Sequence, residues 1–149
     1  MVTLKEINKA IVQQVKEGLK NTAYKDIQFS STDIREKITR PSFYVDFLEN
    51  KTSMLNGEAE QRNFDVRLFY FVKNREANKI ELLEMQDLLS LIFQNGIKVY
   101  DDYYIAVNEC EFDSRGEEGL LITTLSDLYS LSEKEQTGEP LEELEMERW

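Results

Sequence analysis

The chain opens with a regular stripe of apolar residues. It consists of Leu4, Ile7, Ile11, Val15 and Leu19. Because these residues are three or four positions apart, they lie on one face of a helix. Thr3 and Glu6 stand at the spacing of a capping box. We therefore predict a helix from Thr3 to about Asn21. Gly18 falls inside it, and we favour a tolerated glycine near the helix end over a close approach of another backbone.

Alternating apolar residues then predict strands. A short extended segment is expected from Asp26 to Ser31, and Pro41 ends any helix in the charged stretch that precedes it. Beyond the proline, Phe43, Val45 and Phe47 alternate with other residues, which indicates a strand with one buried face. A loop containing Asn56-Gly57 follows.

A longer strand is predicted from Gln61 to Lys73. One face carries Phe64, Val66, Leu68, Tyr70 and Val72, and the other carries Asp65, Arg67, Phe69 and Phe71. The end of this strand is apolar on both faces, so both must be covered. We expect a helix on one side and something else, such as a neighbouring subunit, on the other.

A second helix is predicted up to Phe93, before the left-handed C-cap expected at Asn95-Gly96. Its main stripe is read as Ile80, Leu83, Asp87, Leu88, Leu91 and Ile92. A second set widens the apolar side and consists of Leu82, Met85, Leu89 and Phe93. So wide a stripe indicates a helix pressed onto a sheet.

The rest of the pattern is typical of an antiparallel meander. Its three strands are expected at Ile97 to Tyr100, Tyr103 to Phe112 and Gly119 to Tyr129, followed by a Glu-rich stretch. The fold class is thus α+β, with a mostly antiparallel sheet packed against two main helices. We expect a single domain over residues 1–130 and a flexible acidic tail over residues 131–149.

The net charge of −11 narrows the choice of partners. An acidic surface repels phosphate backbones and anionic membranes, so we expect no specific nucleic-acid binding and no membrane association. No run approaches the roughly 20 apolar residues of a membrane span, and no secretory signal is visible. Cys110 has no partner for an internal disulfide, and the neighbouring Glu109 and Glu111 disfavour its thiolate, so an inert thiol is expected.

Residue types that carry catalysis are scarce. The sequence contains no histidine, which removes the commonest general base and metal ligand, and its glycines are too scattered to cradle a phosphate. The acidic pairs Asp101 with Asp102 and Glu109 with Glu111 are read as a solvated turn and strand face. We therefore expect no enzyme activity, no cofactor and no metal site.

Aromatic and terminal residues point instead to protein contacts. Core packing and an oligomer interface explain Phe69, Tyr70 and Phe71 better than stacking with single-stranded bases, which requires a basic groove. Trp149 is either a docking anchor or an unused terminal residue. The residues selected for a protein interface are Lys51, Met54, Leu55, Arg62, Phe69, Phe71 and Trp149.

Several segments in this order resemble one known family. They are the helix LKEINKAIVQQVKEGL, the extended IQFSS, the junction ITRPSFYVDFLE, the strand RNFDVRLFYFV and the helix IELLEMQDLLSLIF, before the closing strands and the acidic tail. The Arg40-Pro41-Ser42-Phe43 junction is the most specific piece. Over most of residues 1–145 the chain resembles the tail terminators of tailed bacteriophages and phage-derived contractile particles.

The resemblance implies an α/β subunit that forms a hexameric ring on the head-proximal end of the tail tube. Its implied partners are copies of itself, tail tube and possibly sheath proteins, and a head completion or neck protein. It implies neither catalysis nor a cofactor. The protein would occupy the bacterial host cytoplasm during assembly and the tail of the particle afterwards.

Two other classes stay open. A small acidic inhibitor, such as an immunity protein or a DNA mimic, would use its negative charge to occupy a basic enzyme, although the acids here are dispersed along the chain. A metal-dependent nuclease is a more distant alternative.

Overall fold

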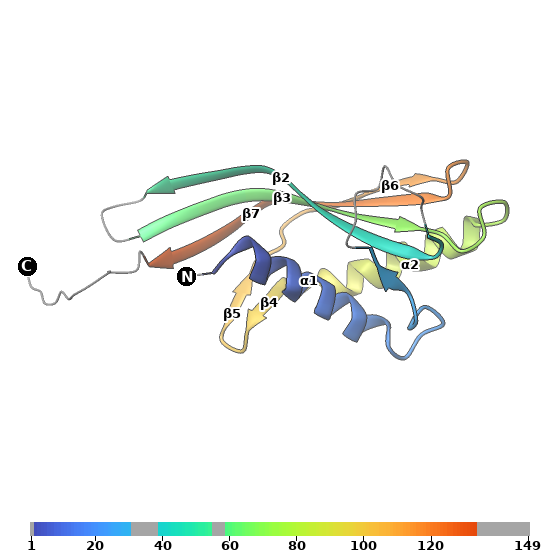
Figure 1. Cartoon of the computed structure of the whole chain (residues 1–149), viewed down its shortest axis with the longest axis horizontal. Helices are drawn as coiled ribbons and strands as arrows, with labels where there is room; N and C mark the ends of the chain where they lie inside the picture. The colour runs from blue at the N-terminus through green and yellow to red at the C-terminus, as the bar shows by residue number, and fades with distance from the viewer. Residues whose placement is uncertain (1, 31–38, 55–58, 134–149) are drawn as a thin grey trace, which may run out of the picture.

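The computed structural model describes residues 2–30, 39–54 and 59–133 (Figure 1). The predicted Asn56-Gly57 loop, most of the charged stretch before Pro41 and the tail from residue 134 lie outside these ranges. Within the described ranges the chain forms two helices and seven strands.

The fold is α+β, as predicted, with two helices on one face of a sheet (Figure 1). The helices are α1 (Leu4–Leu19) and α2 (Lys79–Phe93). The five-stranded sheet has the order β1-β2-β3-β7-β6, formed by β1 (Gln28–Phe29), β2 (Ser42–Met54), β3 (Ala59–Phe71), β6 (Cys110–Arg115) and β7 (Leu120–Glu133). β1 runs parallel to β2, and the other neighbours are antiparallel. A separate hairpin contains β4 (Ile97–Tyr100) and β5 (Tyr103–Ile105).

Helix α1 forms as its sequence predicts. The Thr3 hydroxyl oxygen accepts from the Glu6 backbone N–H at 3.1 Å, and the Thr3 N–H donates to the Glu6 carboxylate at 2.9 Å. These two bonds satisfy donors that a helix start otherwise leaves unpaired. The predicted stripe is buried at Ile7, Ile11, Val15 and Leu19.

The sheet supplies the other half of the core. Its buried side chains follow the predicted alternation and are Phe43, Phe64, Val66, Leu68, Tyr70, Leu121, Leu125 and Leu128. Full burial of an apolar side chain of this size is worth about 1.5–3 kcal/mol. The two helices and the inner face of the sheet therefore share one hydrophobic core.

Helix α2 buries only part of the apolar side predicted for it. The residues against the sheet are Leu82, Met85, Leu89 and Phe93. Leu88 and Ile92 of the predicted main stripe pack against the core. Ile80, Leu83 and Leu91 of the same stripe are exposed, so the prediction was wrong for these three residues. The helix is apolar around most of its circumference, and spacing alone therefore allowed two stripes. The C-cap residue is Gln94, and the glycine with positive φ that the sequence predicted at the helix end is Gly96, whose φ is +90°.

The middle strand of the predicted meander is divided in the structure. The expected strand from Tyr103 to Phe112 splits into β5, which pairs with β4, and β6, which pairs with β7 at the edge of the main sheet. The alternation is the same in both halves, so the pattern cannot show that residues 106–109 carry the chain from one sheet to the other. β7 ends at Glu133 rather than Tyr129, because its extra residues continue to pair with β3.

Arg40 holds together the ends of three strands. Its guanidinium donates to the carbonyl oxygens of Gly119 at 2.8 Å, Glu118 at 3.0 Å and Val72 at 3.3 Å, and it stands 5.7 Å from the centre of the Phe71 ring. The following Arg40-Pro41 bond is cis. The junction that the sequence marked as most specific thus anchors the start of β2 to β3 and β7.

Candidate assembly interface

Part of the sheet extends beyond the helices as a projection that we call the arm. It comprises residues 51–54 of β2, 59–63 of β3 and 129–133 of β7, and it forms the left end of the sheet in Figure 1. The register shifts where the arm leaves the body, between Leu48 and Lys51 and between Phe64 and Val66. Such bulges bend a strand and increase its twist.

The arm carries polar side chains on both faces. The register places Thr52, Arg62 and Ser130 on the face that continues the core. The opposite face carries Lys51, Asn63 and Tyr129. Because the apolar alternation of the body stops here, the arm does not extend the hydrophobic core.

One edge of the arm is open. β1 pairs with β2 only at Ser42 and Phe43, so from Tyr44 onward no other described strand lies on that side of β2. An unpaired edge presents rows of N–H and C=O groups that a further strand can use. The β7 edge is partly occupied, since the Leu131 N–H donates to the Tyr103 hydroxyl at 3.1 Å.

The interface residues selected from the sequence fall in different places. Lys51 and Met54 are exposed on the arm, and Met54 keeps 51% of its surface accessible. Arg62 also lies on the arm, but its side chain is largely buried 3.7 Å from the Glu60 carboxylate. Leu55 and Trp149 lie outside the described residues.

Phe69 and Phe71 lie on the outer face of the body rather than on the arm. Phe69 is half-buried beside Tyr44, with ring centres 6.1 Å apart. Phe71 is only 6% exposed, under the Arg40 guanidinium. Its own chain therefore provides cover that we had expected from a neighbouring subunit. The interface role of the selected residues stays a prediction.

Two surfaces were missed by sequence reasoning. The first is the exposed stripe of α2, formed by Ile80, Leu83 and Leu91. Its apolar residues were noticed, but they were read as core. The second is a groove of about 750 Å³ between α1 and the β4–β5 hairpin. No residue pattern indicated it, because it depends on how the hairpin packs against the helix.

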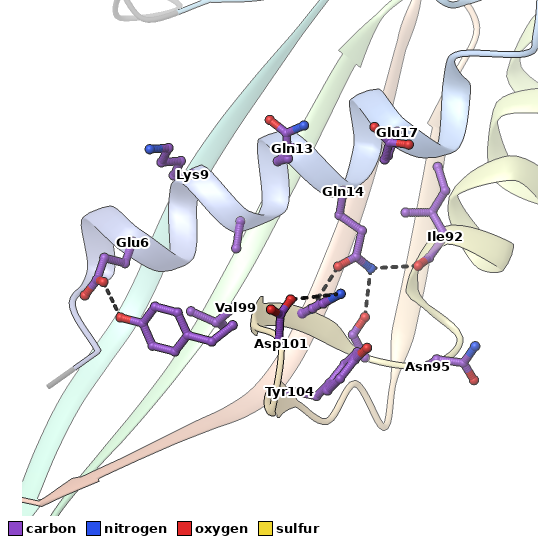
Figure 2. Close-up of a pocket in the computed structure, with 14 residues that line it drawn as sticks. Glu6, Lys9, Gln13, Gln14, Glu17, Ile92, Asn95, Val99, Asp101 and Tyr104 are labelled. Carbon is purple, nitrogen blue, oxygen red and sulfur yellow. Dashed lines mark hydrogen bonds and ion pairs between the residues drawn. The ribbon is translucent and has the colours of Figure 1, made fainter.

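Gln14 closes the floor of this groove (Figure 2). Its side-chain amide donates to the carbonyl oxygens of Ile92 and Gly96, both at 2.8 Å, and accepts from the Lys98 N–H at 2.9 Å. One side chain therefore ties α1 to the end of α2 and to β4.

Tyrosines line the hairpin side of the groove. Tyr100 and Tyr104 are both exposed. The Tyr100 hydroxyl donates to the Glu6 carboxylate, and this bond lowers the pKa of Glu6. Exposed tyrosine rings are common contact groups in protein interfaces.

The acidic pairs that the sequence offered as candidate catalytic or metal-binding groups do not come together in one site. Asp101 and Asp102 lie in the exposed β4–β5 turn, and Glu109 and Glu111 are exposed. Within the described residues no three His, Cys, Asp or Glu side chains are grouped as metal ligands. Cys110 is half-buried, and burial raises the pKa of its thiol.

An open strand edge and exposed apolar side chains are features of proteins that assemble with other proteins. A family profile described as phage tail terminator protein matches residues 6–138, which is most of the chain. The chain therefore belongs to the phage tail terminator family and is a structural component of phage tail assembly that interacts with other tail and head proteins. No curated protein matches the sequence. Neither helix of the described part has the length and hydropathy needed to cross a bilayer.

Proposed function

We propose that copies of this chain form a hexameric ring that caps the tail tube, and the sheath where one is present, and joins it to head completion or neck proteins. Family membership supports the role in the tail. The observation that carries the ring is the projecting arm with its open β2 edge. The hexamer itself is the expectation given by the family resemblance.

The arm suits a contact between two different surfaces of neighbouring copies. Such head-to-tail contacts close into rings when the rotation between copies permits it. Strand addition at the β2 edge would supply main-chain hydrogen bonds, and exposed side chains such as Met54 and Lys51 would supply specificity. Since the arm extends outside the core, it can lie against another copy without unfolding the body.

The exposed stripe of α2 supplies a second surface. In Figure 1, α2 lies toward the end of the molecule opposite the arm. Ile80, Leu83 and Leu91 are apolar and accessible there. We assign this stripe to the end of the tail tube, which leaves the arm for contacts between copies.

Two matched substitutions separate these roles. Met54 and Leu83 are 51% and 49% exposed, so an aspartate at either position should leave the fold intact. Met54→Asp should lower ring formation by roughly tenfold or more, because a charge would be desolvated between copies. Leu83→Asp should still form rings but should cap tubes poorly.

Native mass spectrometry would measure ring formation, and negative-stain electron microscopy of assembled tubes would measure capping. A strictly monomeric protein at high concentration, without affinity for tube or sheath subunits, would contradict the proposed function. Loss of rings in Leu83→Asp but not in Met54→Asp would reverse the roles of the two surfaces.

A further inference from the structure

The main sheet has an edge on each side where no further described strand pairs. β2 is open from Tyr44 onward, because β1 reaches only Ser42 and Phe43. On the other side the sheet ends at β6, which among the described strands pairs only with β7. A contact between two different surfaces of neighbouring copies can join such edges, because each presents unpaired main-chain N–H and C=O groups.

The strand directions fit a sheet that continues from one copy to the next. β2 is antiparallel to β3, β3 to β7 and β7 to β6, so β2 and β6 run in opposite directions within one copy. When copies lie side by side around a ring, β6 of one copy therefore meets β2 of the next as an antiparallel pair. Antiparallel pairing is slightly more stable per residue than parallel pairing.

Both edge strands carry charges on the face of the sheet that points away from the helices. On β6 these residues are all exposed, and they are Glu111, Asp113 and Arg115. On β2 the same face carries Asp46, Leu48 and Lys51. The order along β6 is thus negative, negative, positive, and the order along β2 is negative, neutral, positive.

The register between copies decides whether these charges attract or repel. Followed across β7 and β3, Glu111 lies level with Asp46 of its own copy. A neighbour placed without a shift would bring these two carboxylates opposite each other, and like charges opposite each other destabilise a sheet. A shift by one position on the same face is no better, because Asp113 then lies opposite Asp46.

A shift by two positions toward the arm removes the conflict. Glu111 then lies opposite Lys51. Arg115 lies opposite Asp46, so both pairs join opposite charges, and such cross-strand pairs stabilise a sheet. A shift by three positions keeps a single pair of this kind, between Asp113 and Lys51.

The two cations of this register are accessible. Lys51 is exposed and makes no ion pair within the residues that the structure describes. Arg115 pairs with Asp113 at 2.9 Å and with Glu118 at 3.8 Å, but its side chain is 47% exposed. A guanidinium has five N–H donors, so Arg115 can bind a further carboxylate.

We propose that β6 of one copy adds to the β2 edge of the next copy as an antiparallel strand, in the register that places Glu111 opposite Lys51. The proposal names the surface that receives the β2 edge, and it rests on the ring proposed above. A shift of four residues displaces neighbouring copies by about 14 Å along the strands. A closed ring accommodates such a stagger when its strands tilt from the ring axis.

A disulfide between copies tests this pairing. In the proposed register Asp113 lies opposite Leu48, so Leu48→Cys with Asp113→Cys in a Cys110→Ala background should cross-link neighbouring copies under mild oxidation. Within one copy β2 and β6 are three strand spacings apart, about 14 Å, whereas a disulfide needs Cα atoms within about 7 Å. We expect covalent multimers on non-reducing gels that disappear on reduction.

The matched control is Leu48→Cys with Ser114→Cys in the same background. Ser114 is also exposed, but it points to the other face of β6 and should give no multimers. Rings that native mass spectrometry detects in the Leu48→Cys, Asp113→Cys variant without any cross-link would overturn the β6–β2 pairing and leave the ring intact. If the Cys110→Ala protein forms no rings, the proposed function fails and the pairing fails with it.

Charge reversal provides a second test without introduced cysteines. Lys51→Glu and Glu111→Lys are both at exposed positions, and each should weaken the contact between copies about fivefold. The double variant restores a pair of opposite charges and should form rings as the wild type does. Net charge alone predicts opposite effects of the two single variants, since the charge of −11 changes by −2 in the first and by +2 in the second. More rings in Glu111→Lys, or additive losses in the double variant, would therefore overturn the proposed register.

Discussion

At the scale of single residues, the buried hydroxyl of Tyr70 links β3 to α2. Tyr70 is fully buried on the core face of β3, and its hydroxyl donates to the Glu81 carboxylate, which also accepts from the Lys73 N–H at 2.8 Å. Burial, followed by the bond to Glu81, raises the pKa of Tyr70 above its ordinary value of 10.0. The alternation in the sequence predicted that Tyr70 faces the core but could not show its partner on α2.

Tyr70→Phe should lower the free energy of unfolding by about 1–3 kcal/mol at neutral pH, because the buried bond to Glu81 is lost. The raised pKa means that the fold favours the protonated phenol. Its contribution is therefore complete below the unfolded pKa of about 10 and is lost as the pH rises above it. The difference from wild type should shrink between about pH 8 and about pH 11.

Urea unfolding at both pH values would measure this change. Tyr104→Phe is the control, since its ring is exposed and no hydrogen bond of its hydroxyl is found in the described part of the chain. A difference between Tyr70→Phe and wild type that stays constant with pH would contradict the argument.

At the scale of elements, the contact between the two helices depends on Gly18. A Cβ atom at this position would lie 2.4 Å from Cγ1 of Ile92, which is closer than real atoms approach. From the sequence, a tolerated glycine near the helix end was favoured over a close approach of another backbone. The neighbour is instead a side chain of α2, and only the packing of the two helices could reveal it.

Gly18→Ala should therefore destabilise the wild-type protein, because an overpacking cost of about 1–3 kcal/mol exceeds the gain in helix propensity. In an Ile92→Ala background the space is free, and the same substitution should stabilise by up to about 1 kcal/mol. A double-mutant cycle measured by urea unfolding would test this coupling. Additive effects of the two substitutions would show that Ile92 does not restrict position 18.

At the scale of the whole molecule, charge and assembly oppose each other. Every copy that joins a ring brings a net charge of −11, so neighbouring copies repel. Salt shortens the Debye length from roughly 30 Å at 0.01 M to roughly 3 Å at 1 M and reduces this repulsion. The contacts made by the arm must therefore contribute more binding free energy than the remaining repulsion between copies costs.

Raising the salt concentration across that range should increase the ring fraction in sedimentation velocity experiments. Rings that dissociate with salt would show that attraction between opposite charges holds the copies together.

The sequence by itself determined the elements, because their signals are local. The capping box of α1, the alternation of β3 and the glycine after α2 all act within a few residues, and the structure confirms them. The phage tail terminator family could likewise be recognised from the order of segments along the chain, and the family profile confirms it.

The tertiary structure decided which apolar surfaces are buried in the core and which stay exposed for contacts with other proteins. The exposed stripe of α2, the division of Tyr103 to Phe112 between two sheets, and the groove beside α1 were not predictable from the sequence. Each depends on which of several apolar faces packs against the sheet. The packing of the whole core decides this, and the pattern within one element does not. Local periodicity does not contain this information, because it records that a face is apolar but not what covers it.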